Sequence, residues 1–186
     1  MISTNEMKRG MCVEIDGDIY RVLSFEHIKM GRGSAQVKMK VQNVRSGAIV
    51  ERGYQSGAKF PRITLEYRKV QYSYHDEDLY TFMDTQTYDQ LQINRSQLGD
   101  DAYYLKDGVQ VDLLMYGDEP VGVELPTNVD LLVTETEPGY KGDTATGGNK
   151  PAIMETGLKI LVPLFVGTGD TIKVDTRSGQ YLERVS

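Results

Sequence analysis

An arginine lies between two glycines in residues 29–35, and the chemistry it offers is the recognition of anions. Glycine adds no side chain and tolerates positive φ, so Gly31 and Gly33 leave the Arg32 guanidinium as the main functional group of this stretch. A guanidinium presents a planar fork of N–H donors that matches phosphate oxygens. The same stretch is equally typical of a hairpin turn that holds a solvated arginine, and residues 29–35 alone do not separate the two interpretations.

Two further polar segments offer similar chemistry. Residues 141–144 form part of a glycine-rich polar run, and a C-terminal hairpin carries Arg177, Tyr181 and Arg184. Glycine-rich turns present backbone amides to phosphates, and tyrosine gives bases a stacking face. Lysines also flank Arg32, at positions 29, 38 and 40. Each segment alone is more often a solvated turn, but together they make RNA the leading class of partner.

The sequence offers little support for catalysis or metal binding. His27 and His75 are the only histidines, and neither has a carboxylate or cysteine at zinc-ligand spacing. A nucleophile elbow and a Walker loop are both absent. The acidic turn at residues 75–78 does not meet the spacing of a calcium loop. We therefore expect no catalytic residue, no metal and no cofactor, and a binding protein rather than an enzyme.

Composition indicates a globular protein of the cytoplasm. Of 186 residues, 39% are hydrophobic and 26% are charged, which is typical of a folded chain. Cys12 is the only cysteine, so no intrachain disulfide can form and a reducing compartment is favoured. The N-terminal residues do not resemble a signal peptide, and no apolar run approaches the roughly 20 residues of a membrane span. We expect no membrane partner.

The net charge of −6 conceals a strong asymmetry along the chain. Residues 1–63 hold 11 Lys and Arg against 6 Asp and Glu, a net of +5. Residues 64–127 hold 4 against 13, a net of −9, and residues 128–186 hold 6 against 8, a net of −2. Only the segment that contains Arg32 is basic, so one end of the chain can contact a polyanion that repels its middle.

Alternating strands are expected to position these residues. Residues 19–24 and 37–42 alternate on either side of the glycines, which predicts a hairpin with Arg32 at its tip. Dense turn signals exclude a long helix in residues 1–63 and favour a small SH3-like barrel. In residues 64–127 the sequence predicts strands at 70–74, 79–83, 88–91, 109–113 and 121–125, and a helix at 96–106 capped by Ser96. That pattern is typical of an OB-type barrel.

Residues 128–186 repeat the pattern with strands at 131–133, 158–162 and 172–174, so a second OB-type barrel is expected. The polar run at 137–149 is predicted to be a loop. The same tripeptide occurs at two places in the chain, as Arg45-Ser46-Gly47 and as Arg177-Ser178-Gly179, and we call this recurrence the internal echo. Because the flanking residues differ, we interpret the echo as shared turn chemistry and not as a repeat.

At this point the sequence resembles the bacterial translation elongation factor P family over nearly its whole length. The motifs that carry the resemblance are EPGYKGDT at 137–144, GGNKPA at 147–152, VPLF at 162–165 and VDTRSGQY at 174–181. The tip sequence Met30-Gly31-Arg32-Gly33 falls where the family places its functional loop.

The resemblance implies an all-β fold of three consecutive barrels in an L-shaped arrangement that imitates transfer RNA. The domains would be an SH3/KOW-like barrel at 1–63, an acidic OB-type barrel at 64–127 and a C-terminal OB-type barrel at 128–186. It also implies a monomeric, non-enzymatic factor that binds the ribosome between the peptidyl and exit sites, in contact with ribosomal RNA and protein. There the factor would position peptidyl-tRNA and relieve stalling at consecutive prolines.

The resemblance assigns roles to particular residues. Arg32 would contact the acceptor end of the peptidyl-tRNA. The tip loop around it consists of Lys29, Met30, Gly31, Gly33 and Ser34. A loop of Gly142, Asp143 and Thr144 would approach the exit-site codon. Tyr181 and Arg184 would lie near the anticodon stem.

Two alternatives stay open. Many family members carry a modified lysine at the tip, whereas members with a tip arginine are substrates for rhamnosylation by a glycosyltransferase. The sequence around Arg32 is not the loop most closely associated with that subgroup, so both a rhamnosylated and an unmodified Arg32 fit the sequence. A general single-strand RNA-binding OB protein is the alternative function, although the charge of −9 in residues 64–127 weighs against it.

Overall fold

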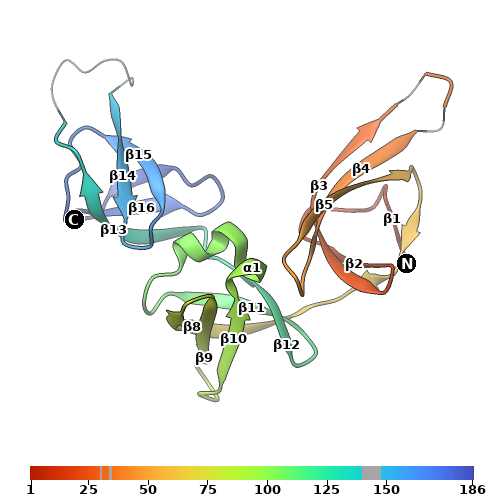
Figure 1. Ribbon diagram of the computed structural model, residues 1–186, viewed down its shortest axis with the longest axis horizontal. Helices are drawn as coiled ribbons and strands as arrows, with labels where there is room; N and C mark the ends of the chain where they lie inside the picture. The colour runs from red at the N-terminus through yellow and green to blue at the C-terminus, as the bar shows by residue number, and fades with distance from the viewer. Residues whose placement is uncertain (30, 34, 140–147) are drawn as a thin grey trace. The chain divides into compact units, whose positions relative to one another are not determined.

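The computed structural model describes residues 1–29, 31–33, 35–139 and 148–186. Nearly every element is a strand, and helical structure in the described ranges is limited to α1 (Arg95–Leu98) and the 3-10 helix η1 (Gly99–Tyr104). Three five-stranded sheets account for most of the chain, together with one two-stranded sheet (Figure 1). The predicted all-β class is confirmed.

The chain divides into two compact units that do not follow chain order. The first contains residues 1–68, 93–99 and 113–122, and the second contains residues 69–92, 100–112 and 123–186. Strands of the middle sheet therefore contribute to both units. The limits at 63/64 and 127/128 stay a prediction.

The N-terminal sheet has the order β5-β4-β3-β2-β7. Its strands are β2 (Cys12–Ile15), β3 (Asp18–Ile28), β4 (Gln36–Asn43), β5 (Ile49–Gln55) and β7 (Arg62–Ile63), while β1 (Ile2–Ser3) pairs with β6 (Lys59–Phe60). Inward residues of β2, β3 and β4 form one core with Phe60. Cys12 is buried, as expected, and burial raises the pKa of its thiol despite the opposing effect of Arg21.

The middle sheet has the order β10-β9-β8-β11-β12. Its strands are β8 (Glu66–Asp76), β9 (Leu79–Asp84), β10 (Gln90–Asn94), β11 (Gln110–Tyr116) and β12 (Glu119–Glu124). The helix predicted at 96–106 is wrong in start, type and end. It begins after Asn94, whose backbone N–H donates to Gln97 Oε1 at 3.2 Å. Gly99 then takes a φ of +58°, which ends the α-helix, and the chain continues as η1 to Tyr104.

The C-terminal sheet has the order β15-β14-β13-β16-β17. Its strands are β13 (Asn128–Thr136), β14 (Asn149–Met154), β15 (Lys159–Pro163), β16 (Thr171–Asp175) and β17 (Tyr181–Arg184). The edge strands β15 and β17 approach each other, so the sheet curls toward closure. Its core includes Leu131, Met154 and Ile172, and it also takes in Tyr104 from η1.

The same hairpin turn occurs once in each five-stranded sheet. Its first residue is Asn43, Asp84 or Asp175, and that side-chain Oδ1 accepts the backbone N–H of the residues two and three positions later, at 2.7–3.1 Å. The fifth residue has positive φ: Gly47 at +78°, Tyr88 at +62° and Gly179 at +73°. The interpretation of the echo as shared turn chemistry is confirmed. Because Tyr88 belongs to this turn, the strand predicted at 88–91 begins only at Gln90.

Gly47 should be the least replaceable residue of these turns. A Cβ at Gly47 would lie 2.0 Å from the backbone oxygen of Ser96, whereas a Cβ at Gly57, with a φ of +88°, would meet nothing within 4 Å. We expect Gly57→Ala to lower the free energy of unfolding by about 1 kcal/mol through backbone strain. Gly47→Ala adds a steric clash, so the loss should reach about 3 kcal/mol or more. Urea unfolding of both variants measures the difference, and equal losses would contradict the predicted contact with Ser96.

Acid should open the turn that begins at Asp175. Backbone N–H groups of Ser178 and Arg177 hold the pKa of the Asp175 carboxyl below its usual value of 3.8. The stabilisation is therefore complete above the unfolded-state pKa and is lost as pH falls through the depressed folded-state pKa. Asp175→Asn keeps the acceptor without the titration, as Asn43 does naturally. Hydrogen exchange at the Arg177 and Ser178 amides should show acid opening in the unsubstituted protein and not in Asp175→Asn. If both proteins open at the same pH, titration of Asp175 is not the cause of the opening.

Candidate nucleic-acid interface

The hairpin formed by β3 and β4 carries Arg32, and its base is fixed in the N-terminal core. Val37, Met39 and Val41 alternate along β4, and all three side chains are 0% exposed. Val37 is only one residue beyond the start of β4 at Gln36. Buried packing therefore reaches almost to the end of the hairpin, drawn in orange in Figure 1.

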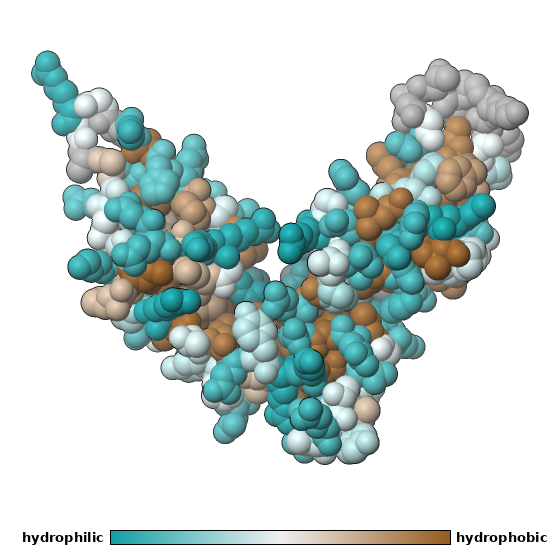
Figure 2. Space-filling model, turned by 180° about the vertical axis from the view of Figure 1, so that it is seen from behind, coloured by the Kyte–Doolittle hydropathy of each residue, from teal (hydrophilic) through white to brown (hydrophobic). Residues whose placement is uncertain are grey.

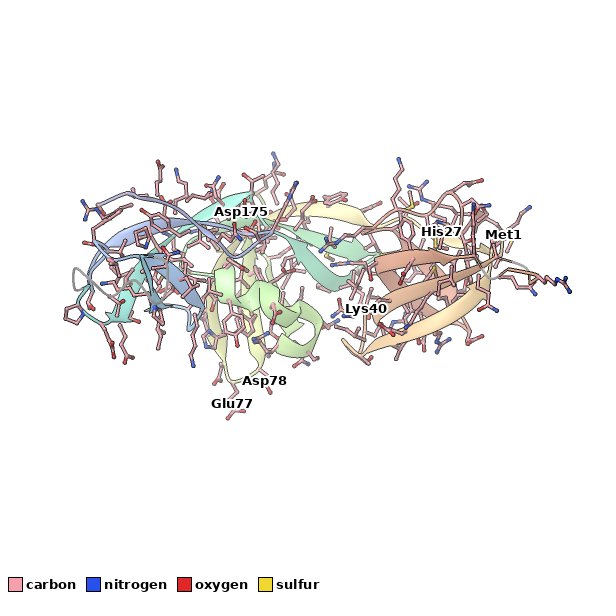
Figure 3. The ribbon with its side chains drawn as sticks, turned by 90° about the horizontal axis from the view of Figure 1, so that it is seen from above. Met1, His27, Lys40, Glu77, Asp78 and Asp175 are labelled. Carbon is pink, nitrogen blue, oxygen red and sulfur yellow. The ribbon has the colours of Figure 1, made fainter. Side chains whose placement is uncertain are left out.

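A third strand supports the hairpin along one side. β5 pairs with β4 from Gln36↔Gln55 to Gln42↔Ile49, so the ladder continues to the first residue after the tip loop. On the other side, the pairing of β3 with β4 shifts between Val22 and Ser24, which leaves Leu23 as a bulge. Beyond the bulge, residues 24–27 of β3 are exposed. His27 and Lys40, from the two neighbouring strands, are labelled in Figure 3.

The structure places the predicted tip loop between Ile28 and Gln36, as the sequence predicts. Lys29, Gly31, Arg32 and Gly33 are all exposed. Met30 and Ser34 lie outside the described residues. Among the ion pairs of the described residues, none involves the Arg32 guanidinium, so its donors are available to an external anion.

The positive charges near the tip are not equivalent. Lys38 was expected to add positive charge there, but its Nζ lies 3.1 Å from Glu51 Oε2 and forms an ion pair. Arg52 is also occupied, because its Nη1 lies 3.0 Å from Asp16 Oδ2 and its guanidinium lies over the Tyr20 ring. Lys29 and Lys40 have no such partner within the described part of the chain. The cations available at the hairpin are therefore Lys29, Arg32 and Lys40.

The second predicted segment is the polar run at residues 141–144. Gly142, Asp143 and Thr144 lie outside the described residues. On its two sides, β13 ends at Thr136 and β14 begins at Asn149. Thr136 Oγ1 donates to the Pro151 carbonyl at 2.8 Å, so these two strands are still joined close to the segment.

The third predicted segment is brought together by a bulge. Tyr181 of β17 pairs with Val174, and Arg184 pairs with Ile172, because the register shifts between Lys173 and Val174. In a regular strand, residues three apart point to opposite faces. Since Val174 and Ile172 lie on the same face, the shift places Tyr181 and Arg184 on one face of the sheet. The structure thus supports treating these two residues as a pair.

Arg184 and Tyr181 are both partly engaged within the barrel. Arg184 Nη1 lies 3.7 Å from Asp170 Oδ2, and its guanidinium lies 5.1 Å from the centre of the Phe165 ring. Tyr181 packs against the C-terminal core and lines a groove of about 610 Å³ together with Lys159. Phe165, which is 62% exposed, was not singled out from the sequence, although it belongs to the VPLF motif.

The described residues contain no group of three His, Cys, Asp or Glu side chains arranged to hold a metal ion. No helix within the described ranges is long and apolar enough to cross a bilayer. Hydrophobic side chains on the face in Figure 2 occur in small groups separated by hydrophilic ones.

Comparison with known proteins identifies a family over nearly the whole chain. Residues 3–60 match the family described as the elongation factor P KOW-like domain, residues 65–123 its OB domain and residues 129–184 its C-terminal domain. An elongation factor P of Moorella thermoacetica is 52% identical over 99% of this chain and 100% of the relative. One from Rippkaea orientalis is 49% identical over the same shares of the two chains.

A solved structure of translation initiation factor 5A from Methanococcus jannaschii matches 67% of this chain and 90% of its own, with 22% identity and a TM-score of 0.46. The family matches cover all three sheets, and the two relatives are matched over their full length. This chain belongs to the elongation factor P family.

Proposed function

We propose that this translation elongation factor binds the ribosome between the peptidyl and exit sites and presents Arg32 to the acceptor end of the peptidyl-tRNA. The observation that carries the proposal is the exposed Arg32 guanidinium, which forms no ion pair among the described residues, on a hairpin whose inward β4 side chains Val37 and Met39 are fully buried. Family membership makes the chain a factor that acts with the ribosome and not an enzyme. The ribosome supplies the peptidyl-transfer chemistry, and the factor contributes position.

A hairpin packed along its inner face and paired with β5 is suited to this role. Holding two reactants in productive geometry can lower a barrier by roughly 7–11 kcal/mol, and a poorly placed acceptor end loses part of that advantage. A charge-assisted hydrogen bond from Arg32 to a phosphate or ribose oxygen would restrict the acceptor end to fewer orientations. Proline reacts slowly in peptide transfer, so stalling at consecutive prolines is where such a restriction has the largest effect.

The remaining site residues extend the proposed contact along the tRNA. Lys29 and Gly33, with Met30, Gly31 and Ser34, form the loop around Arg32. Tyr181 and Arg184, on one face of the C-terminal sheet, would approach the anticodon stem. Gly142, Asp143 and Thr144 would approach the exit-site codon. Ribosomal RNA and protein complete the partners of a monomer that acts in the cytoplasm.

Charge supports the ribosomal role over general binding of single-stranded RNA. Residues 1–63 carry a net charge of +5, whereas residues 64–127 carry −9. A general RNA-binding OB protein would need its OB surface to follow a phosphate backbone, which this charge repels. A factor that touches tRNA at its tip and through Arg184 needs no cationic surface on residues 64–127.

Arg32 is also a candidate substrate for a glycosyltransferase that adds rhamnose. The side chain is exposed and unpaired within the described residues, so its guanidinium is accessible to a modifying enzyme. Intact-mass measurement of the protein from its native source tests this proposal. A mass increased by one deoxyhexosyl group, lost in Arg32→Lys, supports modification, and an unshifted native mass rejects it.

Substitution of Arg32 should slow synthesis through consecutive prolines without affecting the fold. Arg32→Ala removes charge-assisted hydrogen bonds worth about 1.5–3 kcal/mol, so we expect the rate of synthesis through consecutive prolines to fall roughly tenfold or more. Arg32→Lys keeps the charge but loses the planar fork, so its rate should lie between that of the unsubstituted protein and that of Arg32→Ala. A reconstituted translation assay with a proline-rich reporter measures these rates.

Arg9→Ala provides the matched control, because Arg9 is an exposed arginine of the same N-terminal unit, and its neighbour Gly10 hydrogen bonds to Val22, in the part of β3 that is remote from the tip loop. Its rate should equal that of the unsubstituted protein. If Arg32→Ala is as active as Arg9→Ala while both remain folded, the assignment of the tip is wrong.

A further inference from the structure

A large cavity in the second unit is lined by aromatic and acidic side chains that the proposed tRNA contacts do not use. It has a volume of about 810 Å³. Four aromatic residues line it: Tyr72, Tyr74, His75 and Tyr80. Asp107 and Glu155 also line it, with Lys106 as the only residue of opposite charge among the lining residues. All of these residues belong to the same compact unit.

A bulge in β8 assembles the aromatic wall. The pairing of β8 with β9 shifts between Tyr72 and Tyr74, so that Tyr72↔Phe82 is followed by His75↔Tyr80. Without the shift, Tyr72 and His75 would face opposite sides of the strand. With it, the Tyr72 hydroxyl and His75 Nδ1 are hydrogen bonded at 2.8 Å, and the His75 ring stacks on Tyr80 at 4.7 Å.

The carboxylates at the cavity are held without neutralising partners. Glu155 Oε1 accepts the backbone N–H of Leu132 at 3.1 Å, which fixes the side chain but leaves its charge uncompensated. Neither Glu155 nor Asp107 has an ion pair within the described ranges. Burial chiefly raises the pKa of Tyr72 to about 12, and Tyr80 and then Asp107 contribute less.

Acidic side chains also occur beyond the residues that line the cavity. Past His75, the β8–β9 hairpin ends with Glu77 and Asp78, which project into solvent in Figure 3. A neighbouring hollow of about 390 Å³ shares Gly157 with the cavity and is lined by Asp100 and Tyr103, together with Lys159. Aromatic rings beside carboxylates therefore continue from one hollow into the next.

We propose that this aromatic and acidic cavity binds an arginine side chain presented by a basic segment of a partner protein. A guanidinium can stack on tyrosine and histidine rings while its N–H groups donate to carboxylates. Stacked nucleobases would use the same rings, but their phosphates would meet the net charge of −9 in residues 64–127. The occupant is therefore a cation.

The test titrates the full chain, labelled with ¹⁵N, with a synthetic peptide of alternating arginine and glycine. Amide shifts should concentrate at Lys106, Asp107, Thr156 and Gly157. Asp107→Asn and Glu155→Gln should each weaken binding about threefold, as expected for half-exposed ion pairs. The amide oxygen introduced by Glu155→Gln can still accept the Leu132 N–H, so this substitution changes charge without removing that hydrogen bond.

Three controls make the outcome decisive. Glu77→Gln, an exposed acid outside the lining residues, should leave binding unchanged. A peptide with citrulline in place of arginine has the same shape without the charge and should not bind. His75→Phe keeps a ring at the wall and should retain binding, whereas His75→Leu should weaken it.

The proposal is overturned if peptide shifts spread evenly over the acidic surface, if Glu77→Gln weakens binding as much as Glu155→Gln does, or if a single-stranded oligonucleotide shifts the cavity amides and the peptide does not. None of these results depends on Arg32, so they leave the proposed function of the tip unaffected.

Discussion

The row of buried side chains on β4 is the constraint on which the rest of the N-terminal unit depends. Val37, Met39 and Val41 are 0% exposed. Each of them is paired with one residue of β3 and one residue of β5. Since side chains alternate along a strand, this row fixes which residues of the hairpin face outward. A slip of one residue would bury Lys38 and Lys40 and expose the core. The register of the hairpin, and with it the placement of Arg32, is therefore set by hydrophobic burial.

Charge pairing then decides which cations can act on a partner. Lys38 and Arg52 are occupied by Glu51 and Asp16, whereas Arg32 keeps its donors free within the described residues. Exposed ion pairs add little stability, so their larger effect here is to confine available positive charge to the tip and its surroundings. In the acidic cavity of the second unit the arrangement is the reverse, because Asp107 and Glu155 form no ion pair among the described residues. One chain thus offers separate surfaces to anions and to cations.

The sequence predicts the all-β class and the tip hairpin because both follow from alternation and glycine. It misses β14, where Lys150 occupies an inward position: the residue is only 7% exposed, and its Nζ donates to the Glu137 carbonyl at 2.6 Å. Tyr88 resembles a strand residue, and only tertiary structure shows that it stands where the other two turns have glycine. Likewise, a Cβ at Gly122 would lie 2.4 Å from Arg21 Nη2, a contact between strands far apart in sequence. The bulge that places Tyr181 and Arg184 on one face of the C-terminal sheet leaves no signal in the sequence.

The central claim is that the hairpin tip reaches the acceptor end of the peptidyl-tRNA. Site-specific photocrosslinking tests it most directly, with a photoreactive amino acid in place of Lys29, so that Arg32 is preserved. Ribosomes stalled at consecutive prolines would be irradiated with this variant, and the crosslinked nucleotides would be sequenced. The account predicts crosslinks at the terminal nucleotides of the peptidyl-tRNA acceptor end. Crosslinks confined to other regions of the ribosome, with the acceptor end unlabelled, would contradict it.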